Sequence, residues 1–183
     1  GQGKTTTASS LLQEYLHIYG DVAVTIEDPV ELPMDGSIGR AGHCFQTQVE
    51  SGDFAKAMKQ TMRRFPRYIF LGEVRGADEA SQALRAGVNG HLVITTLHAG
   101  DVTEAITAMM KYASGSGENM DLVRSILGDG LAGVIHQELK TVRFEGKSER
   151  RLSLKWLFPG KQKGIRALIR NGKVEQLSTA IEQ

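Results

Sequence analysis

The sequence lacks the features that mark secreted, membrane-spanning and disordered chains. Cys44 is the only cysteine among its 183 residues, which excludes an internal disulfide and a four-cysteine zinc module and favours a reducing compartment. No apolar run approaches the roughly 20 residues that cross a bilayer, and no signal peptide is visible, so any membrane role is expected to be peripheral. Net charge is only +1, with 40% hydrophobic and 23% charged residues, which excludes an acidic disordered tail and a wholly basic nucleic-acid coat.

Charge is balanced over the chain but unevenly distributed along it. Residues 140–173 contain 11 lysines and arginines and 2 acids, whereas residues 1–139 contain 11 basic and 17 acidic residues. The basic segment suits a surface that faces phosphates, lipid headgroups or an acidic partner, and it equally suits a solvated hairpin and helix. DNA binding is the least favoured role, because few aromatic residues lie between the basic ones.

Strand-like and helix-like segments alternate along the first two-thirds of the chain. Short apolar runs without polar alternation, typical of strands buried on both faces of a parallel sheet, occupy residues 22–26, 68–71 and 92–96. Apolar residues at helical spacing predict helices at residues 5–19, 54–64, 78–86 and 103–112. This alternation predicts an α/β fold with a mostly parallel sheet flanked by helices.

Local signals predict how these elements begin and how they are joined. Asp101, with Glu104 three residues later, resembles a helix N-cap and its reciprocal partner. A short strand is expected around residues 45–49, within a glycine-rich loop, and the run Ser-Gly-Ser-Gly-Glu at residues 114–118 predicts a flexible connector between helices.

The C-terminal part of the chain, residues 101–183, is expected to be helical with one hairpin. Residues 141–144 are predicted to pair with residues 152–158 around Gly146. Two short helices are then expected on either side of the turn at Asn171 and Gly172.

The first residues, Gly-Gln-Gly-Lys-Thr-Thr-Thr, read as the second half of a phosphate-binding loop, and the strand that should precede such a loop is absent from the sequence. Gly1 and Gly3 would let backbone N–H groups face the phosphates, and the helix that follows adds its positive end. Lys4 would reach the β- and γ-phosphates, and the Thr5 hydroxyl would bind Mg²⁺.

Carboxylates follow two of the predicted buried strands. Glu27 and Asp28 come after residues 22–26, and Glu73 comes after residues 68–71. Ligands bind at the carboxyl ends of strands in open α/β sheets, so these acids should share a crevice with the phosphate loop. A turn that caps the next segment is the alternative for the first pair. Glu73 could hold Mg²⁺ through a water or deprotonate the attacking water.

Charged and imidazole groups near these acids allow two interpretations each. Arg75 either senses phosphate charge or pairs with a structural acid, and the second is slightly favoured. His91 and His98 bound the third predicted strand, where a histidine is usually a satisfied core side chain. His98 follows the carboxyl end of that strand and is therefore better placed than His91 to contact a γ-phosphate or a neighbouring subunit.

Four motifs occur in a fixed order: Gly-x-Gly-Lys-Thr-Thr-Thr, Thr-Ile-Glu-Asp-Pro-Val-Glu, Gly-Glu-Val-Arg and Gly-His-Leu-Val-Ile-Thr-Thr-Leu-His. This set resembles the Walker A, Asp box, atypical Walker B and His box of the hexameric ATPases of type II and type IV secretion, conjugation and type IV pili. The likeness extends through residues 133–137 and 165–173. It is greatest to the pilus-retraction, Dot/Icm and conjugative-transfer branches, which lack the four-cysteine zinc module of the assembly branch.

The resemblance implies a RecA-like P-loop fold, ATP and Mg²⁺ as ligands, and a role for each matching position. Glu73 would be the catalytic base, with Glu27 the second choice. The implied nucleotide-binding residues are Gly1, Gly3, Lys4, Thr5, Thr6 and His98, the supporting residues are Asp28, Arg63, Arg75 and His91, and the metal-binding residues are Thr5 and Glu73.

The resemblance also implies an assembly and a location. Relatives form homo-hexamers on the cytoplasmic side of the inner membrane, where they act on pilus or secretion platform proteins. Their N-terminal domain completes the nucleotide pocket in trans, and it has no counterpart here, so residues 1–183 are expected to be the C-terminal ATPase domain cut within the Walker A loop, with little or no activity alone. Glu138 departs from the family, which usually has a basic residue at that position.

A second class of function stays open at this point. A P-loop kinase would transfer phosphate to a small acceptor and would usually carry an arginine-rich lid. Residues 101–128 contain no obvious lid of that kind, and so the motor ATPase is favoured over the kinase.

Overall fold

A five-stranded sheet forms the centre of the molecule. The structure is a computed structural model that describes residues 1–50, 53–144 and 147–183. The strands lie in the order β2-β3-β1-β4-β5, and all neighbours are parallel except β2 and β3. Their bounds are β1 Asp21–Glu27, β2 Gly36–Ile38, β3 Gly42–Gln48, β4 Tyr68–Val74 and β5 Leu92–Leu97. The predicted α/β class and the three predicted strands are therefore confirmed, although β5 is only partly buried. The strand expected at 45–49 begins earlier and pairs with the short β2.

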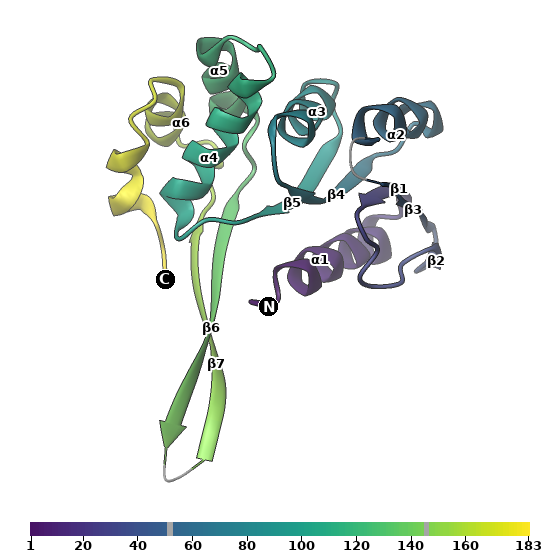
Figure 1. The fold of residues 1–183 in the computed structure, drawn as a ribbon, viewed down its shortest axis with the longest axis horizontal. Coiled ribbons are helices and arrows are strands. Elements are labelled where there is room, and N and C mark those ends of the chain that lie inside the picture. Colours follow the sequence, from purple (N-terminus) through teal and green to yellow (C-terminus); the bar gives the residue numbers. More distant parts are fainter. Residues whose placement is uncertain (51–52, 145–146) are drawn as a thin grey trace.

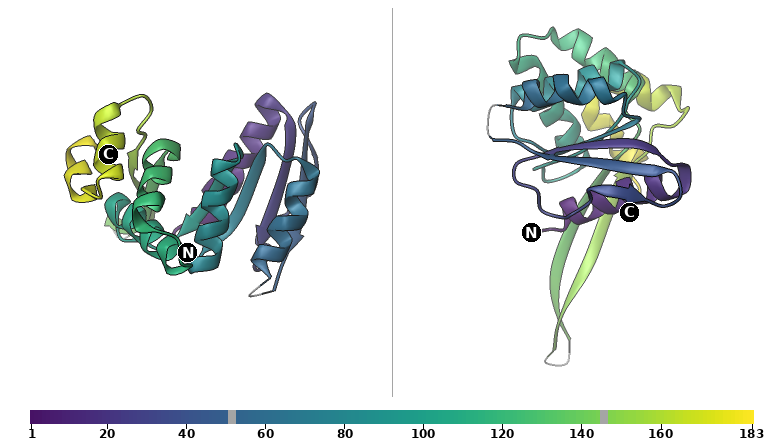
Figure 2. Two further views of the ribbon diagram at one scale, coloured as in Figure 1. Left: turned by 90° about the horizontal axis from the view of Figure 1, so that it is seen from above. Right: turned by 90° about the vertical axis from the view of Figure 1, so that its right-hand side faces the viewer.

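Helices cover both faces of this sheet (Figure 1). Helix α1, Lys4–Tyr19, lies on one face, and helices α2, Phe54–Thr61, and α3, Ala77–Val88, lie on the other (Figure 2). A 3₁₀ turn, η1, Met62–Arg64, continues α2. Alternate residues of β4 serve the two faces, because Tyr68 and Phe70 pack with α1 whereas Ile69 and Leu71 pack with α2 and α3. This two-sided burial explains the unbroken apolar run in the sequence.

Cys44 lies within β3 as a core side chain. It is fully buried, and it packs with the cluster that joins α1 to the sheet. Burial above all, together with the nearby charges of Asp35 and Glu27, raises the pKa of the Cys44 thiol to about 12. The single thiol is therefore a neutral packing group near neutral pH.

The rest of the chain forms a helical unit and a long hairpin. Helices α4, Val102–Gly115, α5, Met120–Gly130, and α6, Lys163–Arg170, pack with the 3₁₀ helix η2, Val174–Ala180, around a core that also includes Val74 of β4 and Ala80 and Leu84 of α3. Strands β6, Val134–Phe144, and β7, Lys147–Leu157, extend well beyond the sheet (Figure 2). Two helices around Asn171 and Gly172 are confirmed, although the second is a 3₁₀ helix.

Two expectations for this part of the chain are wrong in detail. Leu152 pairs with Leu139, and residues 141–144 pair with residues 147–150, because the hairpin begins at Val134 and is longer than predicted. Gly146, at its expected turn, lies outside the described residues. Helix α4 continues through Gly115, so only the end of the predicted connector at 114–118 joins α4 to α5.

Asp101 caps the amino end of α4 as predicted, but the reciprocal hydrogen bond of Glu104 has a different donor. Asp101 Oδ1 accepts hydrogen bonds from the Glu104 N–H and from the Thr103 hydroxyl, both at 2.7 Å. These two bonds, the first above all, lower the pKa of the Asp101 carboxyl. Glu104 Oε2 accepts from the N–H of Gly100 rather than from that of Asp101, so the acid folds back one residue further than in the standard capping box.

Replacing Asp101 with alanine should lower the free energy of unfolding by about 1 kcal/mol, whereas asparagine should largely preserve it. Because the folded-state pKa is lowered, the carboxylate's contribution is present above about pH 4 and is lost as the pH falls through the folded-state pKa. Urea unfolding should therefore show a larger stability difference between the wild type and D101A at pH 7 than at pH 3. An asparagine variant as unstable as the alanine variant would contradict the capping role.

Among the described residues, no helix is both long and apolar enough to cross a membrane.

Candidate functional site

Three side chains from different elements meet at the carboxyl edge of the sheet. Lys4 Nζ, on the first residue of α1, lies 3.3 Å from Nδ1 of His98, which follows β5. His98 Nε2 lies 2.9 Å from Oε1 of Glu73 in β4. An ammonium group only donates, so the neutral imidazole with a free Nδ1 lone pair and a protonated Nε2 satisfies both contacts. The sequence expectation that Lys4, Glu73 and His98 share one edge agrees with this geometry.

Arg75 completes the chain of contacts at this edge. Its Nε donates to Glu73 Oε2 at 2.7 Å, and its Nη2 lies 3.5 Å from the backbone carbonyl oxygen of Asp28. The hydrogen bond to Glu73, together with its charge, raises the pKa of the Arg75 guanidinium. Both oxygens of Glu73 thus face a donor, and its side chain remains 20% exposed.

The start of α1 is shaped for an anion. Gly3 has φ +78° and ψ +17°, a left-handed conformation that glycine adopts without strain, and no side chain among the described residues caps the helix there. The N–H groups of the first turn therefore have no partner within the helix and point outward with its positive end. Thr5, half-buried, and Thr6, exposed, lie on this turn directly after Lys4, with Gly1 exposed ahead of them.

Gln137 of β6 holds the loop in place, and sequence reasoning gave it no role. Its Nε2 donates to the carbonyl oxygen of Gln2, and its Oε1 accepts from the Thr7 hydroxyl at 2.7 Å. The N–H of Leu139 donates to Oε1 of Gln2 in turn. A Cβ at Gly3 would lie 2.8 Å from Gln137 Nε2 and would therefore displace the amide that holds the loop. Nothing in the sequence indicated this role, because Gln137 stands between two other polar residues.

Glu27 lies beside Glu73 but is enclosed. Its side chain is 1% exposed at the end of β1, and its Oε1 accepts from Gln46 Nε2 at 2.9 Å. A Cβ at Gly72 would come within 3.3 Å of Glu27 Cγ, so the acid packs directly against the β4 backbone next to Glu73. Gln46, which also donates to the Leu32 carbonyl, is a second residue that sequence reasoning missed.

Arg63 and His91 do not join this cluster. Arg63 is exposed in η1, and His91 Nδ1 lies 2.6 Å from the carbonyl oxygen of Pro66, just before the amino ends of β4 and β5. Because the strands are parallel, the amino ends of β4 and β5 lie at the opposite edge of the sheet from Lys4 and Glu73. Within one copy of the chain, these two residues are therefore remote from the phosphate loop.

A cation could be held only with help from a phosphate. Among the described residues, no cluster of three or more histidine, cysteine, aspartate or glutamate side chains forms a metal cage. Mg²⁺ commonly uses one or two protein oxygens together with water and substrate phosphates. The Thr5 hydroxyl and the Glu73 carboxylate fit that oxygen set, Glu73 through a water because both its oxygens already accept hydrogen bonds.

The basic segment 140–173 lies on the hairpin and on α6. Lys140 pairs with Glu138 at 3.1 Å and Arg170 with Asp129 at 2.9 Å, while Arg166 donates to the backbone carbonyl oxygens of residues 128 and 129. Some of the basic side chains of this segment are thus paired within the fold, which agrees with the interpretation of the segment as a solvated hairpin and helix.

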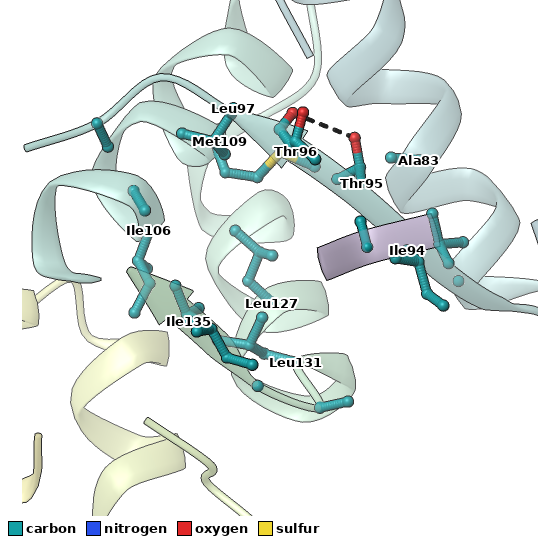
Figure 3. Close-up of a pocket in the computed structure, with 18 of the residues that line it drawn as sticks. Ala83, Ile94, Thr95, Thr96, Leu97, Ile106, Met109, Leu127, Leu131 and Ile135 are labelled. Atoms are coloured by element: carbon teal, nitrogen blue, oxygen red, sulfur yellow. Dashed lines mark hydrogen bonds between the residues drawn. The ribbon is translucent and has the colours of Figure 1, made fainter. Parts of the chain in front are cut away.

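An apolar groove of about 1100 Å³ opens next to the cluster, between β5 and β6. Figure 3 shows Ile94 on β5 facing it from one side and Ile135 at the start of β6 from another, with Met109 and Leu127 contributed by α4 and α5. Gln2, Lys4 and His98 stand at the end of the groove where the phosphate loop lies.

Comparison with known proteins gives one consistent family. The family described as Type II/IV secretion system protein matches residues 1–162. The putative type II secretion system protein E of Escherichia coli K12 is 34% identical over 142 residues, which cover 76% of this chain and 26% of that protein.

Solved structures of similar proteins share the fold. The pilus retraction motor PilT with bound ADP superposes with a TM-score of 0.78 and 31% identity, over 98% of this chain and 50% of its own. The Legionella pneumophila ATPase DotB superposes with a TM-score of 0.83 over 100% of this chain and 51% of its own, and at 24% identity it supports the fold alone. The chain thus spans about half the length of these structures and less of the secretion protein.

Proposed function

This chain belongs to the type II/IV secretion system protein family, and from that premise we propose that it hydrolyses ATP to power a ring-shaped motor. The fold is the RecA-like P-loop fold of the secretion and pilus ATPases. Within the family, pilus retraction, conjugative transfer and Dot/Icm-like secretion are the processes that the proposal covers. Conversion of ATP and water to ADP and phosphate would drive rigid-body movement between domains.

The observation that carries the proposal is the contact chain from Lys4 through His98 to Glu73. It brings a phosphate-binding cation and a carboxylate to one edge of the sheet, next to the free N–H groups of α1. Phosphoryl transfer needs these parts: a cradle for the phosphates, a fixed positive charge, and an acid that positions the attacking water.

The residues would act in sequence as follows. The N–H groups of the first turn of α1 bind the phosphates, and a γ-phosphate oxygen replaces His98 Nδ1 as the acceptor for Lys4. Glu73 then orients a water and takes its proton while the water oxygen bonds to the γ-phosphorus and the bond to ADP breaks. Mg²⁺, when bound by Thr5 and the phosphates, would neutralise charge on the phosphate oxygens.

Several further roles belong to the same proposal. Asp28, whose carbonyl oxygen faces Arg75, and Glu27 would support the water and metal from the next strand. Arg63 and His91, at the far edge of the sheet, could reach a nucleotide only in an adjacent copy, as in a homo-hexamer. We place the assembly on the cytoplasmic side of the inner membrane, with pilus or secretion platform proteins as partners and no structural zinc.

Release of free phosphate without any added acceptor tests the proposal. Incubation with MgATP should yield ADP and inorganic phosphate in equal amounts, and chelation of Mg²⁺ should stop the reaction. The measurement uses a longer polypeptide that contains residues 1–183, because relatives are about twice as long and these residues alone are expected to have little or no activity. Phosphate appearing only on a small acceptor would instead support a P-loop kinase, which family membership does not favour.

A further inference from the structure

We infer that Gln137, on the hairpin strand β6, is a positioning residue for the nucleotide. It fixes the orientation of the peptide bond between Gln2 and Gly3, so that the N–H of Gly3 faces the phosphates. The inference deepens the proposed function, and it rests on that function only in taking the loop before α1 to bind a nucleotide. Nucleotide affinity, rather than the chemical step, should therefore depend on Gln137.

The side-chain amide of Gln137 holds the carbonyl group of Gln2. Its Nε2 donates to that carbonyl oxygen, so the oxygen is directed toward β6. The peptide bond between Gln2 and Gly3 is trans. In a planar trans peptide the C=O group and the N–H group that follows it point in opposite directions. The N–H of Gly3 is therefore directed away from β6, and the partial negative charge of the Gln2 oxygen is kept on the side of β6.

This peptide needs an outside restraint because a glycine follows it. Reversal of the peptide changes ψ of Gln2 and φ of Gly3, and a glycine adopts positive and negative φ about equally well. A reversed peptide would present a carbonyl oxygen, instead of an N–H group, to the phosphates. Binding would then have to select one of the two orientations, which lowers the apparent affinity.

Two further hydrogen bonds hold the amide and the loop in register. The Thr7 hydroxyl donates to Gln137 Oε1 at 2.7 Å, and because this contact occupies the oxygen of the amide, it leaves the NH₂ group directed at Gln2. The N–H of Leu139 donates to Gln2 Oε1, so the side chain of Gln2 is tied to β6 as well as its main chain. The loop and the start of α1 are thus fastened to a strand that lies at least 130 residues away in the sequence.

The chemistry of an amide limits what Gln137 can do. An amide neither takes up nor releases a proton near neutral pH, so it cannot replace Glu73 as the base. Its hydrogen bonds to Gln2 and Thr7 lead to the phosphate loop and to α1. A group that orders a binding loop in advance lowers the entropic cost of binding.

Binding of a fluorescent ADP analogue to a longer polypeptide that contains residues 1–183 tests the inference. Gln137→Met keeps the length of the side chain but loses both hydrogen bonds, and it should weaken ADP binding by about 10-fold. Gln137→Glu keeps the acceptor for Thr7 but sets a carboxylate against the Gln2 oxygen, so it should weaken binding further. At saturating MgATP, kcat should stay within about threefold of the wild type, while KM rises together with the ADP dissociation constant.

Thr7 and Gln13 provide matched variants on α1. Thr7→Ser keeps the hydroxyl and should bind ADP as the wild type does, whereas Thr7→Val keeps the size and should weaken binding by about threefold. Gln13→Met, at an exposed position further along the helix, should have no effect. The midpoint of thermal unfolding should fall by less than about 5 °C in every variant, because Gln137 is only half-buried and the other two residues are exposed.

The role of Gln137 and ATP hydrolysis can fail separately, because ADP binding is measured without turnover. ADP affinity within twofold of the wild type in both folded Gln137 variants would overturn the inference and leave the proposed function in place. So would a fall in kcat with ADP binding unchanged, since the amide would then act in the chemical step. Weaker ADP binding by the variants of a protein that hydrolyses no ATP would uphold the inference alone, and a longer polypeptide that binds no ADP would overturn both.

Discussion

Replacement of Lys4 with alanine should reduce ATP turnover by about 100-fold or more and weaken nucleotide binding. Loss of one fixed charge that stabilises transferring phosphate typically has an effect of that size. The first turn of α1 would keep its N–H groups, so residual binding through the backbone is expected. Titration with a fluorescent ATP analogue and steady-state phosphate release would measure the two effects separately.

The control for this variant is Lys59, an exposed lysine on α2 on the other face of the sheet. K59A should leave binding and turnover unchanged. Stability should also change little in K4A, within about 0.5 kcal/mol, because the ammonium makes one long contact to His98 at a partly exposed position. Turnover of K4A within twofold of the wild type, with its fold intact, would remove Lys4 from the mechanism.

The central sheet could be predicted from sequence because its strands obey a strong local rule. In β4, the side chains on both faces of the strand are buried, and the run Tyr68 to Leu71 is apolar without interruption. The edge strand β2 could not be found in this way, because its three residues, Gly-Ser-Ile, carry too little pattern. The length of the hairpin was underestimated for a similar reason, because charged residues interrupt the apolar pattern of its strands. Lys140 lies opposite Arg151, and Glu149 lies opposite Val142.

The candidate site was predictable in position but not in its contacts. The rule that ligands meet the carboxyl ends of parallel strands places Glu73 and His98 near Lys4 without any coordinates. The supporting amides follow no such rule. Gln137 comes from β6, 130 residues from the Thr7 hydroxyl that it accepts from, and Gln46 reaches Glu27 from the neighbouring strand β3. Such contacts depend on tertiary pairing, which a single sequence does not encode at short range.

The substitution Glu73→Gln should retain ATP binding and slow hydrolysis by about 100- to 1000-fold. Glutamine preserves the shape of the side chain but cannot accept a proton from the attacking water. It also leaves one oxygen, where Arg75 and His98 now use two. Binding should be measured with a fluorescent nucleotide and hydrolysis in a single turnover, so that loss of the base is separated from loss of affinity.

Glu27→Gln is the matched comparison, because both acids lie at neighbouring strand ends and only their surroundings differ. Glu27 is enclosed and accepts from Gln46, so a glutamine there can keep that acceptor but replaces the other carboxylate oxygen with a buried NH2 donor, which should lower stability by about 1 to 3 kcal/mol. Its effect on turnover should be smaller than that of E73Q once folding is restored by lower temperature. If E27Q instead stopped hydrolysis while E73Q turned over normally, Glu27 would be the base, and the contact of Glu73 with His98 would serve only to hold the histidine.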